Sequence, residues 1–94
     1  MTYKLGFHSS AKKEWDALDS AIQLQFKKKL KKRLEEPRVE SDRLSGLKDC
    51  YKIKLRSIGY RMVYQVNDNT IIVSIVAVGK RERNKAYKAA VKRI

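Results

Sequence analysis

The sequence predicts one α+β domain built on a mainly antiparallel four-stranded sheet. Three observations favour this class: an alternating segment followed by two helical patterns, three strand-like segments in quick succession, and a basic helical pattern near the C-terminus. A chain of 94 residues is long enough for one compact domain and too short for two. We therefore expect residues 1–94 to form a single domain, with an N-terminal helical hairpin on one face of the sheet and a C-terminal helix.

The N-terminal residues predict a strand and a short helix. Thr2–Phe7 alternates apolar and polar side chains, which is typical of a strand with one buried face. A helix is then expected to begin at Ala11, with Ser9 or Ser10 as its N-cap. Glu14 stands at the position that completes a capping box.

A longer and strongly basic helix is predicted next. Asp19 can end the first helix and cap this one. The apolar stripe of the helix recurs every four residues, at Ile22, Phe26, Leu30 and Leu34. Its remaining face carries a series of cations: Lys27, Lys28, Lys29, Lys31, Lys32 and Arg33. Pro37 forces the helix to end, because proline has no amide proton and disfavours a helical residue before it.

The second half of the chain predicts a loop, three strands and a helix. Arg38–Asp49 is polar and is typical of a connecting loop. Tyr51–Arg56 alternates throughout, and Tyr60–Val66 follows a tight turn. Thr70–Val78 is almost wholly apolar, as a central strand would be. Arg83–Ile94 can form a basic terminal helix.

The hairpin between the second and third strands gathers positive charge on one face. A two-residue turn at Ile58 and Gly59 fixes a register that buries both apolar sets. This register places three pairs opposite one another: Arg56 and Arg61, Lys54 and Val63, and Lys52 and Gln65. The cations repel one another unless an anion lies among them, so a phosphate site is expected. The alternative is that long basic side chains only solvate an open sheet face.

The overall charge points to a polyanionic partner. Lys and Arg number 23 against 10 Asp and Glu, which gives a formal net charge of +13. Nucleic acid is favoured over a membrane, because the longest apolar run, Ile71–Val78, is far too short to span a bilayer. The alternative is a surface that is only well solvated.

The one cysteine and the one histidine do not indicate a metal site or a nucleophile. Cys50 has only His8 as another soft ligand, which makes no zinc pattern and no catalytic pair. We expect Cys50 to be a small buried residue and His8 a structural or surface residue. No metal or cofactor is expected. Because Met1 is not followed by a long apolar segment, we expect the cytoplasm as the compartment.

Four parts of the chain together carry a family resemblance: Asp49–Gln65, Val78–Arg83, Tyr87 and Ala90–Ile94. They resemble the RelE family of toxins. The likeness runs over essentially the whole chain, including the sequence Glu36-Pro37-Arg38 that ends the basic helix. It implies a RelE/ParE-like fold and the toxin of a type II toxin–antitoxin system. Such a toxin is implied to be a metal-independent endoribonuclease that enters the ribosomal A site, cleaves mRNA and inhibits translation.

The resemblance also implies the partners. They are mRNA, the ribosome with its 16S rRNA, and a RelB-like antitoxin that inactivates the toxin. The antitoxin is also implied to join the toxin in repressing their own operon. Operator DNA would thus be bound only through the antitoxin complex, and no membrane partner is implied.

The functional residues of the family fall on five positions of this chain: Lys52, Lys54, Arg61, Arg81 and Tyr87. The strand pattern independently selects the first three. Further cations are candidates for RNA or ribosome binding: Lys27, Lys28, Lys31, Lys32, Arg33, Arg56 and Arg83. Ser45 departs from the family, where we expect a basic residue, so an RNA contact from this loop is left open.

RNA can be cut without a metal ion when its own 2′-hydroxyl attacks the adjacent phosphate. Lys52 and Lys54 are alternative general bases, because clustered cations lower a lysine pKa, and the pattern does not choose between them. Arg61 suits a phosphate, since its planar fork can hold two oxygens. We place Arg81 near the leaving oxygen, where it would stabilise charge. Tyr87 is suited to stack on an unpaired base.

Two other functions fit a chain of this composition. A ParE-like toxin of similar fold would block DNA gyrase, perform no RNA chemistry and have no need of the five residues together. A non-catalytic RNA-binding protein would tolerate exchange of lysine for arginine at Lys52 and Lys54, because only charge would matter. A lysine that acts as a base would not survive that exchange.

Overall fold

The computed structural model describes residues 2–94, so Met1, which the expected domain includes, lies outside the described residues. The elements are β1 (Lys4–Phe7), α1 (Ser9–Asp16), α2 (Ser20–Glu35), η1 (Glu40–Asp42), β2 (Cys50–Leu55), β3 (Tyr60–Asn67), β4 (Ile72–Lys80), η2 (Glu82–Asn84) and α3 (Lys85–Arg93). The two η elements are single 3-10 turns. The order of strands and α-helices is the one that the sequence predicts. None of the helices in residues 2–94 is long and apolar enough to cross a membrane.

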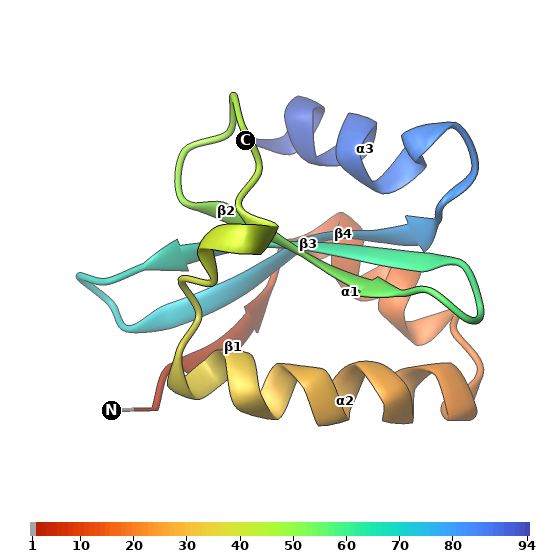
Figure 1. The fold of residues 1–94 in the computed structure, drawn as a ribbon, viewed down its shortest axis with the longest axis horizontal. Helices are drawn as coiled ribbons and strands as arrows, with labels where there is room; N and C mark the ends of the chain where they lie inside the picture. Colours follow the sequence, from red (N-terminus) through yellow and green to blue (C-terminus); the bar gives the residue numbers. More distant parts are fainter. Residues whose placement is uncertain (1) are drawn as a thin grey trace.

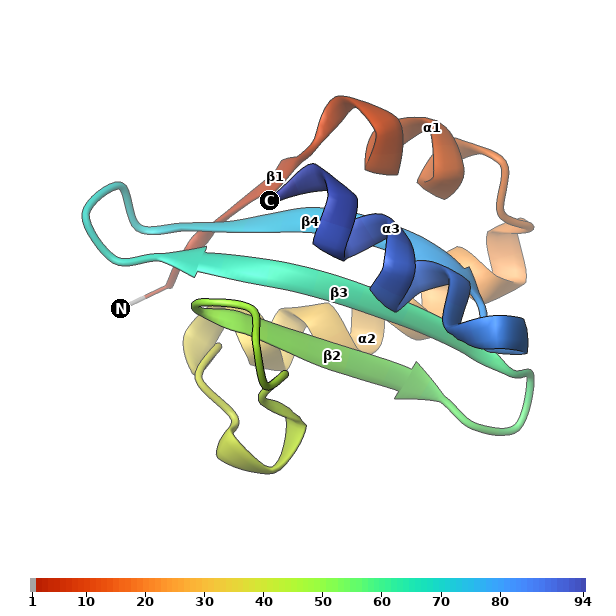
Figure 2. The same cartoon turned by 90° about the horizontal axis from the view of Figure 1, so that it is seen from above.

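The four strands form one mixed sheet in the order β1-β4-β3-β2. β3 pairs antiparallel with both β2 and β4, whereas β1 pairs parallel with β4. The prediction of a mainly antiparallel sheet is therefore wrong for β1. The reason is topological: the chain leaves β1 through the helices and returns at the opposite edge, so β4 later arrives beside β1 in the same direction (Figure 2).

The helices cover both faces of the sheet (Figure 1). α1 and α2 share one apolar cluster with the sheet, and α3 shares another on the opposite face. The prediction of a helical hairpin is also wrong. α1 packs on β1 and β4, whereas α2 packs on β2. The two helices meet at the rings of Trp15 and Phe26, whose centroids are 6.2 Å apart. Each helix diverges to bury its own apolar stripe.

The larger core lies beneath α1 and α2. Phe26 and Leu30 are buried there, as the stripe of α2 predicts. The sheet contributes residues of β2, β3 and β4 that face this side: Tyr51, Ile53, Leu55, Met62, Tyr64, Val66, Val73, Ile75 and Val78. The smaller core beneath α3 contains Cys50, Val63, Val76, Ala77, Ala86 and Ala90. Small residues there allow α3 to approach the sheet closely.

The start of α1 differs from the prediction. His8 is the N-cap, and its Nδ1 accepts a hydrogen bond from the backbone N–H of Ser10 at 3.2 Å. The helix begins at Ser9 because the chain leaves β1 with His8 still extended, which is the backbone conformation of an N-cap. His8 therefore has the structural role that we expected. Glu14 forms no capping box and instead accepts from the N–H of Val78.

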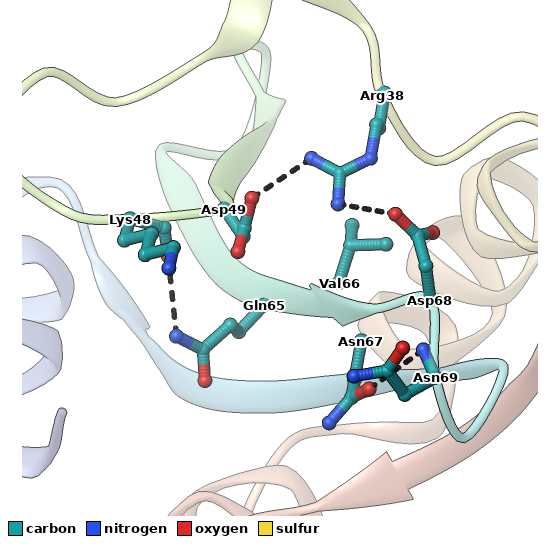
Figure 3. A pocket seen from close by; sticks show the side chains of 8 residues that line it. All are labelled: Arg38, Lys48, Asp49, Gln65, Val66, Asn67, Asp68 and Asn69. Atoms are coloured by element: carbon teal, nitrogen blue, oxygen red, sulfur yellow. Dashed lines mark hydrogen bonds and ion pairs between the residues drawn. The ribbon is translucent and has the colours of Figure 1, made fainter.

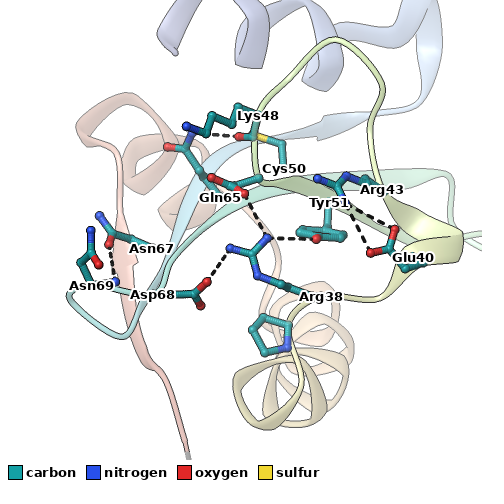
Figure 4. Close-up of polar contacts among 12 residues, drawn as sticks. Arg38, Glu40, Arg43, Lys48, Cys50, Tyr51, Gln65, Asn67, Asp68 and Asn69 are labelled. Atoms are coloured by element: carbon teal, nitrogen blue, oxygen red, sulfur yellow. Dashed lines mark hydrogen bonds and ion pairs between the residues drawn. The ribbon is translucent and has the colours of Figure 1, made fainter.

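Arg38 ties the loop after α2 to the far end of the sheet (Figure 4). Its guanidinium pairs with Asp49 at 3.0 Å and Asp68 at 2.7 Å, and donates to the hydroxyl of Tyr51 at 3.2 Å. These hydrogen bonds raise the pKa of Arg38, and the bond to Asp68 has the largest effect. The hydroxyl of Tyr3 and then Arg38 lower the pKa of the Asp68 carboxyl. The network fixes where β2 begins.

We predict that Phe26→Ala destabilises the protein by about 3–5 kcal/mol, because it removes a fully buried ring that packs on Trp15. Leu24→Ala is the matched control on the same helix. Leu24 is 54% exposed, so its truncation should change the free energy of unfolding by no more than about 0.5 kcal/mol. Urea unfolding followed by circular dichroism measures both. Equal losses in the two variants would contradict the position of α2.

Candidate functional site

The β2–β3 hairpin has a different register from the predicted one. Lys54 faces Arg61 and Lys52 faces Val63, so the turn contains Arg56–Gly59 instead of two residues. The N–H of Gly59 donates to the carbonyl of Leu55 at 2.8 Å, and Gly59 has a φ of 69°, a conformation that favours glycine. The predicted two-residue turn and its three pairs are therefore wrong, although both apolar sets are still buried. A shift of two residues keeps every side chain on its face.

A basic cluster consists of Lys52, Lys54 and Arg61, and it lies on the α3 face of the sheet. The neighbouring side chains of Ile53 and Met62 point into the core beneath α2. Because side chains alternate along a strand, the three cations point the other way. The sharing of one surface by these residues is thus confirmed. Arg56, expected with them, lies exposed in the turn.

Charge within the basic cluster changes the chemistry of Lys54. Its pKa is lowered, first by the positive charge of Lys52, then by partial burial and by the charges of Arg61 and Arg56. A lowered pKa increases the fraction of neutral amine at physiological pH, which is the form that can accept a proton. This direction is a reason to propose Lys54 as the base in the choice that the sequence leaves open.

Tyr87 extends the basic cluster from α3. Burial, opposed by the charge of Arg61, raises the pKa of the Tyr87 phenol. Nη1 of Arg61 and the hydroxyl of Tyr87 are both buried and have no hydrogen-bond partner among residues 2–94. Buried polar atoms of this kind are normally satisfied, so a ligand that supplies oxygen atoms would remove a cost. A phosphate or a nucleotide has such atoms.

Gly79 allows α3 to lie over Arg61. It is the β4 partner of Arg61, and a Cβ built on it would lie 3.9 Å from the backbone nitrogen of Ala86. The first turn of α3 therefore passes directly above the strand. Gly79 directly follows the predicted strand Thr70–Val78. A glycine before a basic run can also signal close approach of two backbones.

Arg81 lies at the rim of the basic cluster, beside the β2–β3 turn. Its N–H donates to the carbonyl of Gly59 at 2.8 Å, and its Nε lies 3.7 Å from the position of a Cβ built on that glycine. Arg81 and Arg56 of the turn line the same hollow. Its other lining residues are Ser57, Ile58, Gly59, Lys80 and Glu82. Arg83 is exposed just beyond it, with a left-handed φ of 55°.

The remaining binding candidates lie on α2, on the opposite side of the sheet from the basic cluster. Four of them are exposed: Lys27, Lys28, Lys31 and Lys32. Arg33 differs from them. It donates to the carbonyl of Lys52 at 3.0 Å and to the hydroxyl of Tyr64 at 2.9 Å, and it pairs with Asp42. The prediction that Arg33 lies on the free basic face of α2 is therefore wrong.

A hollow at the other end of the sheet is not the candidate site (Figure 3). Its lining is polar: Arg38, Lys48, Asp49, Gln65, Val66, Asn67, Asp68 and Asn69. Arg38 is already paired with two carboxylates there. Arg61 and Asn67 stand near opposite ends of β3, roughly 20 Å apart at the rise of a strand. The hollow is thus remote from the basic cluster.

Comparison with known proteins identifies the family. The family model described as the ParE toxin of type II toxin–antitoxin system, parDE, matches residues 5–85. Over 94 residues the chain is 55% identical to the mRNA interferase toxin RelE of Escherichia coli strain K12, covering 100% of this chain and 99% of that protein. The chain belongs to the RelE family of type II toxins. The ParE description thus applies to the family model, whereas this full-length relative is a RelE protein.

Solved structures of RelE proteins have the same fold. A mutant of E. coli toxin RelE in the free state matches with a TM-score of 0.91 and 53% identity, over 100% of this chain and 99% of that one. The toxin chain of the intact E. coli RelBE toxin–antitoxin complex matches with a TM-score of 0.83 and 54% identity. That match covers 86% of this chain and 99% of the other.

Two cations of α2 hold the outer edge of β2 in this RelE-family chain. Lys29 donates to the carbonyl of Lys54 at 3.1 Å, and Arg33 donates to that of Lys52. β2 is an edge strand, so these carbonyls would otherwise face solvent. The helical pattern alone did not predict this role. The signal was present, because the pair has i, i+4 spacing and Lys29 directly precedes buried Leu30.

Three other sequence expectations concern the surroundings of the site. Ser45 is exposed in a loop that, with Tyr87 and Val91, lines a hollow beside α3. Cys50 is fully buried, as predicted, and burial raises the pKa of its thiol to about 11. No three His, Cys, Asp or Glu residues within residues 2–94 are grouped so that they could hold a metal ion.

We predict that Lys52→Gln raises the pKa of Lys54 towards that of an ordinary lysine, because Lys52 is the largest cause of the lowering. Arg56→Gln should produce a smaller rise in the same direction. NMR titration of the lysine ε-carbons measures both. Lys48→Gln, which removes an exposed charge before β2 begins, is the control. An unchanged Lys54 pKa in Lys52→Gln would show that the two amines do not interact.

Proposed function

We propose that this chain, residues 1–94, is one toxin domain of a type II toxin–antitoxin system. It acts as a metal-independent endoribonuclease that cleaves mRNA in the ribosomal A site and so inhibits translation. The observation that carries the proposal is the pairing of Lys54, whose pKa is lowered, with Arg61, whose buried Nη1 lacks a partner among the described residues. The E. coli relative, named an mRNA interferase toxin, supports the same activity.

The proposed reaction is attack of an RNA 2′-hydroxyl on the adjacent phosphate. The neutral amine of Lys54 takes the hydroxyl proton, and the new P–O bond gives a cyclic phosphate as the bond to the 5′-oxygen breaks. Arg61 stabilises the charge on the phosphorane, and Arg81 stabilises the leaving oxygen, which takes its proton from water. Lys52 keeps the pKa of Lys54 low. Tyr87 stacks on an exposed base and orients the nucleotide.

The distribution of charge explains why the ribosome would be needed. Exposed cations of α2 lie on one side of the sheet and the basic cluster on the other. We propose that α2 docks on 16S rRNA while the opposite face receives mRNA. The decoding centre then bends the mRNA into the in-line geometry that a small site with a weak general base cannot impose alone. This target places the toxin in the cytoplasm.

The partner that restrains the toxin is, in this proposal, a RelB-like antitoxin. Solved structures of RelE proteins include the E. coli RelBE complex and a RelE mutant with a RelB peptide. The high positive charge of this chain would attract an acidic antitoxin segment. The complex would bind operator DNA and repress the operon, and no membrane partner is proposed.

We predict codon-phased cuts in an mRNA incubated with the purified protein and programmed ribosomes, and none without ribosomes. Lys54→Ala and Arg81→Ala should each lower the cleavage rate by about 100-fold or more. Lys54→Arg should be equally inactive, because a guanidinium does not act as a base. Lys13→Ala, at an exposed position of α1, is the control. Primer extension maps the cuts. Cuts retained in Lys54→Arg would show that position 54 contributes only positive charge and that Lys54 is not the general base.

We predict that neutralising four exposed α2 lysines together weakens ribosome binding and flattens its dependence on salt, because fewer counterions are released. The substitutions are Lys27→Gln, Lys28→Gln, Lys31→Gln and Lys32→Gln. Titration of labelled small ribosomal subunits at several salt concentrations measures the effect. The same variant should keep the Lys54 pKa of the wild type. Unchanged salt dependence would place the docking surface elsewhere.

The second candidate function is inhibition of DNA gyrase, favoured by the ParE description of the matching family model. RNA that remains intact in every primer-extension reaction would overturn the ribonuclease proposal. A supercoiling assay with purified gyrase would then test this alternative.

A further inference from the structure

β4 continues beyond the end of β1, and a bulge redirects its edge there. β1 pairs with β4 only as far as Phe7 and Ile75. In the β3–β4 ladder Val63 faces Ala77 while Tyr64 faces Ile75, so Val76 is the extra residue of a β-bulge. Past a bulge the backbone groups that face each edge change over. The carbonyl of Val76 and the N–H of Val78 therefore point to the side where β1 has ended.

Glu14 of α1 and Arg93 of α3 occupy the place of the missing strand. Oε1 of Glu14 accepts from the N–H of Val78 at 3.1 Å, and Nη1 of Arg93 donates to the carbonyl of Val76 at 2.8 Å. The two side chains also pair with each other, at 2.8 and 3.1 Å. One carboxylate and one guanidinium thus satisfy both edge groups of β4. We call this arrangement the Glu14–Arg93 clamp.

The apolar contacts of α3 are few. Within the described chain, its buried side chains are those of Ala86 and Ala90, Tyr87 and Ala89 pack partly buried on the same core, and Val91 is 60% exposed. Nine residues are too few for a helix to be stable by itself. The residues before it, Arg83 and Asn84, have left-handed backbone conformations that non-glycine residues rarely adopt. The position of α3 therefore depends on its polar contacts as well as on this small apolar interface.

Arg93 supplies those polar contacts at the end of α3. It connects the helix to α1 through a carboxylate and to β4 through a carbonyl. Its side chain is only 19% exposed, so the ion pair is shielded from water and should contribute more than a surface pair does. Tyr87 lies on the first turns of the same short helix, so any movement of α3 would also move the Tyr87 ring away from Arg61.

We propose that Glu14 and Arg93 are positioning residues, which hold α3 on the bulged edge of β4 and so keep Tyr87 against Arg61. The activity part of this inference rests on the proposed ribonuclease function. The clamp itself acts on the fold and has consequences that need no RNA.

The first experiment follows Tyr87 and α3 in the purified protein. Arg93→Ala should move the raised pKa of the Tyr87 phenol down towards that of an exposed tyrosine, as seen by NMR titration of labelled tyrosine rings. Amide hydrogens of α3 should exchange at least about tenfold faster, while those of β2 and β3 keep their protection. Arg93→Lys, which retains one donor, should lie between the two states. Lys92→Ala, exposed on the same helix turn, is the matched control.

Glu14→Gln separates the clamp from general damage to the fold. The glutamine oxygen can still accept from Val78, but the charge that attracts Arg93 is gone. It should therefore speed exchange in α3 without changing exchange in α1. Arg93→Ala should add little to Glu14→Gln, because the two residues act as one unit. Unchanged α3 exchange and an unchanged Tyr87 pKa in both variants would overturn the clamp.

The second experiment measures ribosome-dependent cleavage in a double-mutant cycle. Arg93→Ala should lower kcat by about 10- to 100-fold with little change in KM, since a small displacement of an orienting group has such effects. In a Tyr87→Ala background the same change should cost no more than about twofold. A full loss in that background would overturn action through Tyr87. If the wild type cuts no RNA while Arg93→Ala still frees α3, the proposed function fails and the clamp is supported.

Discussion

The antiparallel pairing of β2 with β3 is the constraint on which the candidate site depends. Each strand alternates apolar and basic side chains, and the apolar ones must enter the core beneath α2. Burial of Ile53 and Met62 therefore forces Lys54 and Arg61 onto one surface. The attraction that holds the core thus supplies the free energy that brings like charges together. Their repulsion in turn lowers the pKa of Lys54.

The two faces of the sheet are covered unequally, and this inequality leaves part of the α3 face uncovered. Large residues of α1 and α2 seal one face, whereas α3 meets the other through alanines. Gly79 lets α3 lie low over β4, next to the strand that carries Arg61. The β2 side of that face is then left to the basic cluster. Lys29 and Arg33 hold the outer edge of β2 from the opposite side.

Arginines and lysines have separate tasks in this molecule. Within residues 2–94, arginine supplies the cation of every ion pair except that between Lys12 and Asp16. Arg33, Arg38 and Arg93 each join several elements, because a planar guanidinium can serve several acceptors at once. Asp42, Asp49, Asp68 and Glu14 pair with these three arginines. Within residues 2–94, Lys12 is the one lysine in these ion pairs.

The sequence by itself determined the order of elements, the stripe of α2 and the common face of Lys52, Lys54 and Arg61. These follow from periodicity, which depends only on neighbouring residues along the chain. It also carried the resemblance to the RelE family, because the basic segments stand in order over the whole chain.

Only the tertiary structure decided the features that depend on distant residues. Periodicity fixes the face of a side chain but not a register shift of two, so the partner of Lys54 was predicted incorrectly. The parallel pairing of β1 follows from the route of the chain around the sheet. Arg33 binds a carbonyl of β2, and Glu14 and Arg93 bind an N–H and a carbonyl of β4. These contacts depend on which backbone groups the sheet leaves unpaired. No local sequence pattern predicts these unpaired groups, because they exist only once the strands have paired.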